Sequence, residues 1–321
     1  HPLLDLFGVD PKIVDALPDE VSGEGYLNSL SPLHLEQYLS IADEVLDQVL
    51  ASGDSPPTEL QRQLFGELLA SGADPLSTAR KVAESLAKKA YRRPASDAEV
   101  QVLVEVFDFG RRSELTNRES LRLMLKAMLV SPQFLFITPA EEVDAEAEIV
   151  PLDDYQLASR LSYLLWATMP DDELMSLADA GTLHEPPILK AQVKRMLEDP
   201  RSRALFDGFG AQWLELQDLK SKSFDPARFP EMTAEMRSSM YDEVRLFFES
   251  IVRENLSVAR FIDSDYTFLN ENLATIYGLE EAVVGSEMRK VALIDATRGG
   301  SVRMAGVAGA LYVATGSIAD T

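Results

Sequence analysis

The chain has 321 residues and 46% of them are hydrophobic, which excludes a wholly disordered chain and suits two or three domains. With 30 Lys and Arg against 53 Asp and Glu, the formal net charge is −23, which disfavours nucleic acid and anionic lipid as partners and favours cations or basic proteins. The chain has no cysteine, which excludes disulfides, thiolate metal sites, iron–sulfur clusters and a covalently attached c-type haem of its own. No apolar run approaches the roughly 20 residues that a membrane helix needs, so membrane insertion is not expected.

The first half of the chain shows helical patterns separated by turns. Ser31 is suited to cap a helix that starts at Pro32 and carries apolar residues at spacings of three and four as far as Leu50. Further helices are predicted over 57–71, 75–91, 96–110 and 117–130, and Ser96 with Glu99 forms a capping-box signal for the third of these. We interpret 1–55 as the tail of an upstream helical domain and 56–140 as a small helical domain.

The second half begins after an acidic stretch at 141–150, which has little to bury and is interpreted as an interdomain linker. Helical patterns then run from 153 to a stop at Met169-Pro170, from Asp171 onward, and over 186–199, 201–219 and 230–255. Residues 288–294 alternate weakly, which indicates a strand. These patterns predict a larger helical domain over 151–321, expected to continue beyond Thr321. The predicted fold class is all-α, with two multi-helix bundles and little or no β-sheet.

Metal and phosphate motifs are weak in this sequence. The three histidines His1, His34 and His184 are far apart, so no zinc site is predicted, although His184 lies in a turn between two helices and is a candidate binding residue. The segment 263–267 (DSDYT) starts like an EF-hand loop, but the sixth position is not glycine and the twelfth is not glutamate. Ca²⁺ therefore stays a weakly supported ligand, and no glycine-rich phosphate loop follows a predicted strand.

The acidic and aromatic candidates have ordinary structural interpretations beside their functional ones. Asp171 and Asp172 are candidate binding or acid–base carboxylates, but their place at a helix start is also explained by capping. Trp166 and Trp213 lie on apolar helix faces, so core packing is expected for both, and Trp166 is retained as a binding candidate. No paired carboxylate signature stands out, and whether the chain is an enzyme is left open.

Two arginines are further candidates. Arg160 lies in an otherwise apolar helix, and we expect it to be half-buried and to need a carboxylate or a ligand anion as a partner. Arg298 precedes two glycines, which let a backbone approach its neighbour closely. Neither pattern by itself identifies a ligand.

Ordered motifs along the chain resemble planctomycete-type secreted domains of unknown function. The second half carries LASRLSYLLW at 157–166, MPDDEL at 169–174, RMLEDPRS at 195–202, QWL at 212–214, DYTFLN at 265–270, YG at 277–278 and RGG at 298–300. A smaller preceding domain is indicated by YRRP at 91–94 and LVSPQFL at 129–135, and the tail of a further upstream domain by LSPLHLEQYL at 30–39. The family pattern is usually more apolar at 301–304, where this chain has SVRM.

The resemblance implies a context rather than a reaction. Such domains usually accompany a c-type cytochrome segment in large exported bacterial proteins, so we expect a haem-free module that supports or positions a downstream c-type haem domain of the same polypeptide, in electron transfer or oxidative polymer breakdown. A periplasmic, cell-surface or extracellular location is implied in the same way. Two alternatives stay open: a scaffold that binds cations or polysaccharide without a redox role, and a carboxylate-dependent enzyme acting on polysaccharide. The sequence does not predict an oligomeric state.

Overall fold

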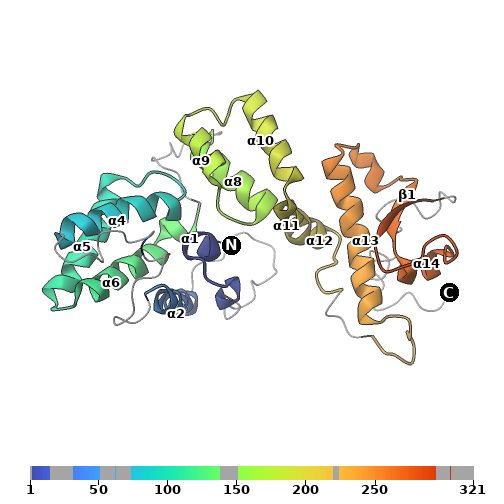
Figure 1. The fold of residues 1–321 in the computed structure, drawn as a ribbon, viewed down its shortest axis with the longest axis horizontal. Coiled ribbons are helices and arrows are strands. Elements are labelled where there is room, and N and C mark those ends of the chain that lie inside the picture. Colours follow the sequence, from blue (N-terminus) through green and yellow to red (C-terminus); the bar gives the residue numbers. More distant parts are fainter. Residues whose placement is uncertain are drawn as a thin grey trace. The chain divides into compact units, whose positions relative to one another are not determined.

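The computed structural model describes residues 2–14, 32–50, 62, 74–137, 151–219, 224–293 and 304. The chain forms two compact units: unit 1 comprises His1–Tyr163 and Thr168–Leu189, and unit 2 comprises Leu164–Ala167 and Lys190–Thr321. The described residues are mainly helical, with one two-stranded sheet, which confirms the predicted all-α class (Figure 1). The predicted linker at 141–150, almost all of the predicted helix over 57–71, and Arg298 lie outside the described residues. The sequence-based domain limits stay a prediction.

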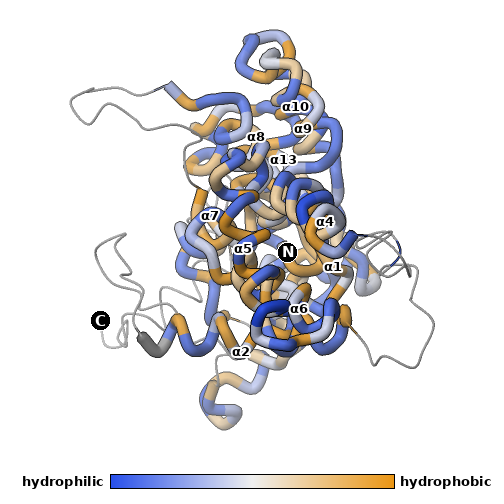
Figure 2. Tube along the Cα trace, turned by 90° about the vertical axis from the view of Figure 1, so that its left-hand side faces the viewer, coloured by the Kyte–Doolittle hydropathy of each residue, from blue (hydrophilic) through white to orange (hydrophobic). Residues whose placement is uncertain are grey.

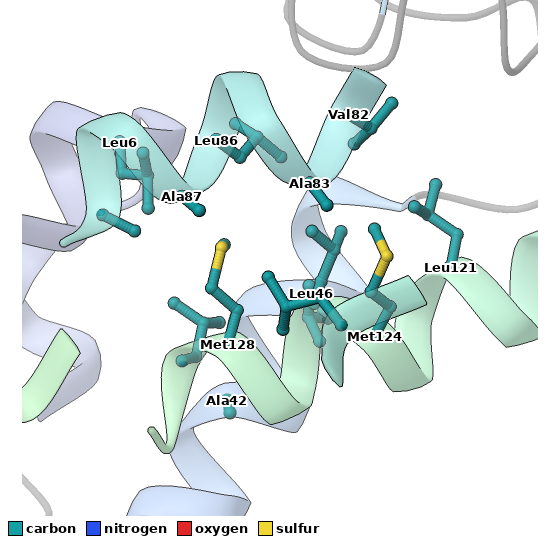
Figure 3. Packing of buried hydrophobic residues seen from close by; sticks show 14 of the residues in the cluster. Leu6, Ala42, Leu46, Val82, Ala83, Leu86, Ala87, Leu121, Met124 and Met128 are labelled. Carbon is teal, nitrogen blue, oxygen red and sulfur yellow. The ribbon is translucent and has the colours of Figure 1, made fainter. Parts of the chain in front are cut away.

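Unit 1 contains a bundle of amphipathic helices. Its helices are α1 (Pro2–Phe7), η1 (Pro11–Val14), α2 (Pro32–Val49), α4 (Pro75–Ala90), α5 (Asp97–Arg112), α6 (Asn117–Leu129), α7 (Pro132–Leu135), the start of α8 (Asp154–Trp166), α9 (Asp172–Asp179) and the first turn of α10 (Pro186–Glu198). Hydrophobic and hydrophilic residues alternate around helices such as α5 and α6, as amphipathic packing requires (Figure 2). Leu46 of α2, Leu86 of α4 and Met124 and Met128 of α6 meet in the core (Figure 3).

Local capping sets the ends of these helices. The predicted capping box of Ser96 and Glu99 is present at the start of α5, and Thr116 with Glu119 forms a second one before α6 that the sequence analysis did not identify. Gly110 lets α5 approach α6, because a Cβ atom there would lie 2.8 Å from the Oγ of Ser120. Each capping box joins residues three positions apart, so the starts of α5 and α6 are encoded locally in the sequence.

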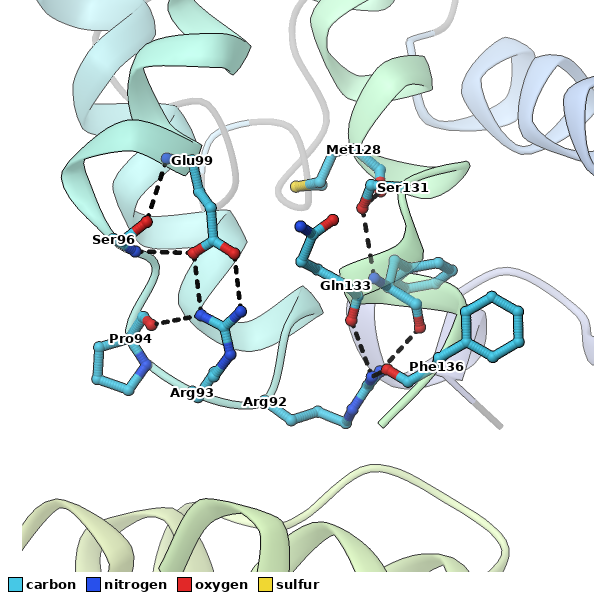
Figure 4. Close-up of polar contacts among 10 residues, drawn as sticks. Arg92, Arg93, Pro94, Ser96, Glu99, Met128, Ser131, Gln133 and Phe136 are labelled. Carbon is cyan, nitrogen blue, oxygen red and sulfur yellow. Dashed lines mark hydrogen bonds and ion pairs between the residues drawn. The ribbon is translucent and has the colours of Figure 1, made fainter. Parts of the chain in front are cut away.

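The motif at 91–94 has a structural explanation in unit 1. Arg92 adopts a positive φ of 57° and is buried, and its guanidinium donates to the carbonyl oxygen of Ala90 at 3.1 Å. It also donates to the carbonyl oxygens of Gln133, Phe134 and Phe136 at 2.6–3.1 Å (Figure 4). The guanidinium of Arg92 is held by four carbonyl oxygens and not by a carboxylate. Burial is therefore the largest influence on the pKa of Arg92, and it lowers that pKa. Arg92 therefore fastens the end of α7 to the α4–α5 turn.

Arg93 forms a different contact beside it. Its two terminal nitrogens donate to the carboxylate of Glu99 at 2.9 and 2.7 Å, a bidentate pair that is largely buried (Figure 4). The hydrogen bond from Arg93 lowers the pKa of Glu99, and the one to Glu99 raises the pKa of Arg93. The same Glu99 carboxylate closes the capping box, so one side chain fixes both the turn and the start of α5.

In unit 2, the helix predicted over 201–219 is confirmed only as far as Trp213, and it is not a regular α-helix. Instead of one helix over 201–219, the chain forms η3 (Pro200–Ser202), α11 (Arg203–Leu205), the π-helix η4 (Phe206–Gly210) and α12 (Ala211–Trp213). Gly210 explains the π-helical turn in part, because a Cβ atom there would lie 2.6 Å from the ring of Phe206 and 3.2 Å from that of Phe248. The wider π-turn and the missing side chain let these rings pack against the backbone.

The remaining elements of unit 2 pack around its longest helix. They are α13 (Ala234–Arg253), η5 (Val258–Phe261), β1 (Tyr266–Leu269), α14 (Glu271–Tyr277) and β2 (Arg289–Ala292). The strands are antiparallel, with Tyr266 opposite Ala292 and Leu269 opposite Arg289. The strand predicted within 288–294 is confirmed as β2, whereas its partner β1 was not predicted. The fully buried Glu243 of α13 accepts hydrogen bonds from Thr267 of β1 at 2.6 Å and from Tyr277 of α14 at 2.5 Å, which ties the three elements together.

Candidate functional site

In unit 1, an aspartate–histidine pair joins the start of α8 to the loop after α9. The Asp154 side chain is only 8% exposed, and it accepts hydrogen bonds from the backbone N–H groups of Leu183 at 3.0 Å and His184 at 3.1 Å. The Nδ1 atom of His184 lies 2.9 Å from the Oδ1 atom of Asp154. Because a carboxylate only accepts hydrogen bonds, this contact assigns the hydrogen to Nδ1 and leaves Nε2 as the basic nitrogen of the neutral ring.

The pair borders an open depression of about 430 Å³ in unit 1. That volume lies within the range of ligand pockets, although this depression is open rather than enclosed. Its walls come from the start of α8, the end of α9 and the loop before α10. The residues that line it are Leu152, Asp153, Asp154, Tyr155, Ala178, Gly181 and His184.

A second polar group orders the wall of the depression. The Tyr155 hydroxyl donates to the carboxylate of Asp179 at 2.9 Å, and the Lys88 ammonium donates to its other oxygen at 2.7 Å. Burial, together with the Asp179 carboxylate, raises the pKa of Tyr155 to about 12. The hydrogen bond from Lys88 lowers the pKa of Asp179. Tyr155 therefore stays protonated near neutral pH, and it lines the depression without acting as an acid or base.

In unit 2, the π-helix and η5 present apolar side chains to solvent. Phe209 and Trp213 are 52% and 53% exposed, and their rings stack with centroids 6.1 Å apart at an interplanar angle of 14°. Phe261 packs its edge against Trp213 at 5.4 Å, and Val258 and Ile262 in the same short segment are 79% and 73% exposed. We call these five residues the aromatic patch. The predicted core packing of Trp213 is therefore wrong.

The π-helix holds the patch in place through buried contacts. Phe206 is fully buried against Tyr241 and Phe248, and the Tyr241 hydroxyl donates to the carboxylate of Asp207 at 2.7 Å. Burial and the Asp207 carboxylate raise the pKa of Tyr241. Gly208, which precedes Phe209, faces open space, because a Cβ atom there would meet nothing within 4 Å. Glycine on each side of an aromatic residue was the sequence signal for this exposed ring.

Trp166 behaves as predicted for a core residue. It is only 4% exposed, and its indole N–H donates to the carbonyl oxygen of Met196 at 2.9 Å. The guanidinium carbons of Arg201 and Arg195 lie 3.5 and 5.3 Å from its ring centroid, which places two cations against the ring. These contacts describe a packed side chain and identify no ligand.

The other sequence candidates lie apart from the depression. Asp171 caps α9 by accepting from the backbone N–H of Leu174 at 3.0 Å, and the exposed Asp172 is the first residue of that helix. Neither lines the depression. Arg160 is exposed, so the expectation of a half-buried arginine is wrong: it lies on the outward side of α8, while its neighbours Ala158 and Ser159 are buried.

The pairing of Asp154 with His184 was not predicted from the sequence. Asp154 lies at a helix start and His184 lies 30 residues away in a turn, so no local rule connects the two. Among the residues that the structure describes, no group of three or more histidines and carboxylates is arranged to hold a metal ion. The described part of the chain also has no helix that is long and apolar enough to cross a membrane.

Three domain-family models match the chain, and each is described only as a protein of unknown function. Residues 1–51 match PSD3 (DUF1587), residues 78–138 match PSD5 (DUF1595), and residues 152–279 match PSD4 (DUF1592). Neither the curated proteins nor the solved structures gave a match. The chain is thus similar to three consecutive domains of the planctomycete type, and the match to PSD4 contains both the aspartate–histidine pair and the aromatic patch.

Proposed function

We propose that this chain is the haem-free helical module of an exported, cytochrome-associated polypeptide, and that the aromatic patch of unit 2 is its contact surface for the c-type haem domain. The three domain matches support this context, because they agree with the family resemblance from which the context is taken. The observation that carries the proposal is the patch itself. A folded domain rarely leaves stacked aromatic rings and neighbouring aliphatic side chains together in solvent unless they contact something.

The composition of the patch suits a protein contact. Tryptophan is among the residues that contribute most at interfaces, and removing its side chain there costs roughly 2 kcal/mol or more of binding free energy. The rings of Phe209 and Phe261 both contact Trp213 and fix its ring before binding, so little conformational entropy is lost on docking. The patch therefore has the properties of a pre-organised apolar anchor.

The chemistry of the chain favours a haem domain as the occupant. The net charge of −23 attracts a partner with a basic surface and repels nucleic acid and anionic lipid. The edge of a haem macrocycle is apolar, which matches the patch, and its propionates are anionic. Arg260 lies in η5 beside Phe261, 3.1 Å from Asp265, and is a candidate propionate contact.

The native gene gives the first test. The proposal requires an export signal and a Cys-x-x-Cys-His haem motif in the same reading frame as this chain. An uninterrupted native reading frame without that motif would refute the proposal.

The second test measures docking in the native haem-containing polypeptide. We expect the double substitution Phe209→Ser and Trp213→Ser to release the haem domain to limited proteolysis and to shift the haem midpoint potential, because docking excludes water from the haem edge. Phe109→Ser in α5 is the matched control, since Phe109 is 64% exposed but lies outside the patch. Equal proteolysis and potential in the patch variant and the control would contradict the proposal. If the isolated chain instead dimerises or binds polysaccharide through the patch, and the haem domain is unaffected, then the second copy or the polysaccharide is the partner of the patch.

A further inference from the structure

We propose that His184 is a general base oriented by Asp154, and that the depression beside it binds uncharged carboxylic esters for hydrolysis. This inference rests on residues of unit 1 alone and does not depend on the function proposed for the aromatic patch. It assigns His184 as the catalytic residue and Asp154 as the residue that positions it.

The geometry fixes the imidazole ring at one nitrogen and exposes the other. Asp154 is buried and its carboxylate is held by two backbone N–H groups, so it cannot turn away from Nδ1 of His184. The His184 side chain is 64% exposed and lines the depression, so solvent and ligands have access to the ring. A buried aspartate that holds one tautomer and stabilises the imidazolium ion is the arrangement by which histidine works as a base.

Capping alone does not account for this arrangement. The two backbone contacts of Asp154 would be satisfied with any residue except proline at position 184, since they use only the N–H groups of the loop. The imidazole contact is additional, and it directs the basic nitrogen away from the buried carboxylate. The side chain at position 184 thus adds a proton acceptor to a loop that is already fastened.

The surroundings of the ring limit the ligands that fit. Asp153 and Asp154 come from the start of α8, Asp179 from the end of α9, and Glu185 follows His184 in the loop, while Lys88 of α4 is bound to Asp179. This excess of carboxylates repels anions. Leu152, Ala178 and the Tyr155 ring add apolar surface to the walls. An uncharged substrate with an apolar part is favoured.

Water is the second reactant in this hydrolysis, and it reaches the His184 ring through the open depression. Nε2 of His184 takes a proton from water as the water oxygen bonds to the ester carbonyl carbon. The tetrahedral intermediate then breaks its bond to the alkoxide oxygen, which receives the proton from Nε2. Ester and water become acid and alcohol, and the imidazole returns to its neutral form. Asp154 stays ionised and stabilises the imidazolium during the cycle.

The first experiment measures the tautomer of His184 by ¹H–¹⁵N correlation NMR of the intact chain. With only three histidines, the ring signals are assigned by comparison with His184→Gln and His34→Gln. Above the range where the ring is protonated, we expect His184 to carry its hydrogen on Nδ1, whereas free histidine side chains favour Nε2–H. A predominant Nε2–H form at His184 would overturn the inference.

The second experiment follows turnover of p-nitrophenyl acetate as a function of pH. We expect His184→Gln to lower kcat/KM by about 100-fold, as for loss of a general base. His34→Gln is the matched control and should leave the rate unchanged. Asp154→Asn should lower the rate and alter the pH profile; the NMR of the wild-type chain covers the case in which this variant fails to fold. A fixed tautomer with an unchanged rate in His184→Gln would mean that the pair is structural and would also overturn the inference.

Discussion

The surroundings of Trp166 and Trp213 differ although the sequence places both residues on apolar helix faces. Trp166 ends a regular α-helix and is buried, its N–H donates to the Met196 carbonyl oxygen, and the guanidinium groups of Arg195 and Arg201 lie against its ring. Trp213 follows a π-helix and is 53% exposed to solvent, although its ring contacts those of Phe209 and Phe261. Apolar periodicity therefore identifies a packing surface but not its partner. One tryptophan serves the core, and the other is available for a contact.

Truncating the two tryptophans separately gives the largest expected effect. We expect Trp166→Ala to lower the free energy of unfolding by about 3–5 kcal/mol, because it leaves a buried cavity and the Met196 carbonyl without its donor. Trp213→Ala should cost about 1 kcal/mol, from lost ring contacts alone. Urea unfolding of both variants measures the contrast, and equal losses would show that Trp213 is also a core residue.

Gly210 tests whether the π-helix sets the position of the patch. Gly210→Ala forces a Cβ atom against the buried Phe206 and Phe248 rings, so we expect a loss of about 1–3 kcal/mol. Gly208→Ala is the matched control: it meets open space and should be neutral or stabilising by up to about 1 kcal/mol. Thermal unfolding compares the two. Similar effects at both glycines would mean that close ring packing does not shape this segment.

The stabilising contribution of the Arg201–Asp199 pair beside Trp166 should also depend on pH. Arg201 lies against the ring and is held by Asp199 through two contacts of 3.0 and 2.8 Å, and the hydrogen bond from Arg201 lowers the pKa of Asp199. A carboxyl whose folded pKa is lowered stabilises the fold above its unfolded pKa, near 3.8, and loses that contribution as pH falls through the folded value.

The expected effect of this pair is small, about 0.5 kcal/mol, because it is partly exposed. Stability should decline less between about pH 5 and pH 3 in Asp199→Asn than in the wild type, as measured by urea unfolding across this range. An identical decline in both proteins would show that the pair does not contribute.

The features predicted from sequence are those set by neighbours along the chain. Ser96 with Glu99 and Asp171 with Leu174 are capping contacts within three residues, so they were identifiable before the fold was known. The alternation of apolar and polar residues over 288–294 was enough to indicate β2. Strand β1 was not predicted, because the segment 263–267 (DSDYT) was compared with a calcium-binding loop and its pairing with β2 is not visible in the sequence.

The site features depend on contacts that sequence spacing does not encode. His184 was a candidate, but its partner Asp154 is brought to it only when the loop after α9 folds back onto the start of α8. Arg160 was expected to be half-buried because its neighbours are apolar, yet one position on a helix turns the side chain by 100°, enough to reach solvent. Trp213 was misplaced because the π-helix shifts the helical phase before it.

The fluorescence emission of Trp213 reports whether the aromatic patch contacts a c-type haem domain, as we propose. In a Trp166→Phe background, Trp213 is the only tryptophan of this chain. Its emission is compared between the isolated chain and the native polypeptide that carries the haem segment, with Phe or Tyr replacing any tryptophan of that segment. Haem absorbs tryptophan emission at short range, so docking predicts strong quenching that Phe209→Ser relieves. Equal emission in the two proteins would contradict the account.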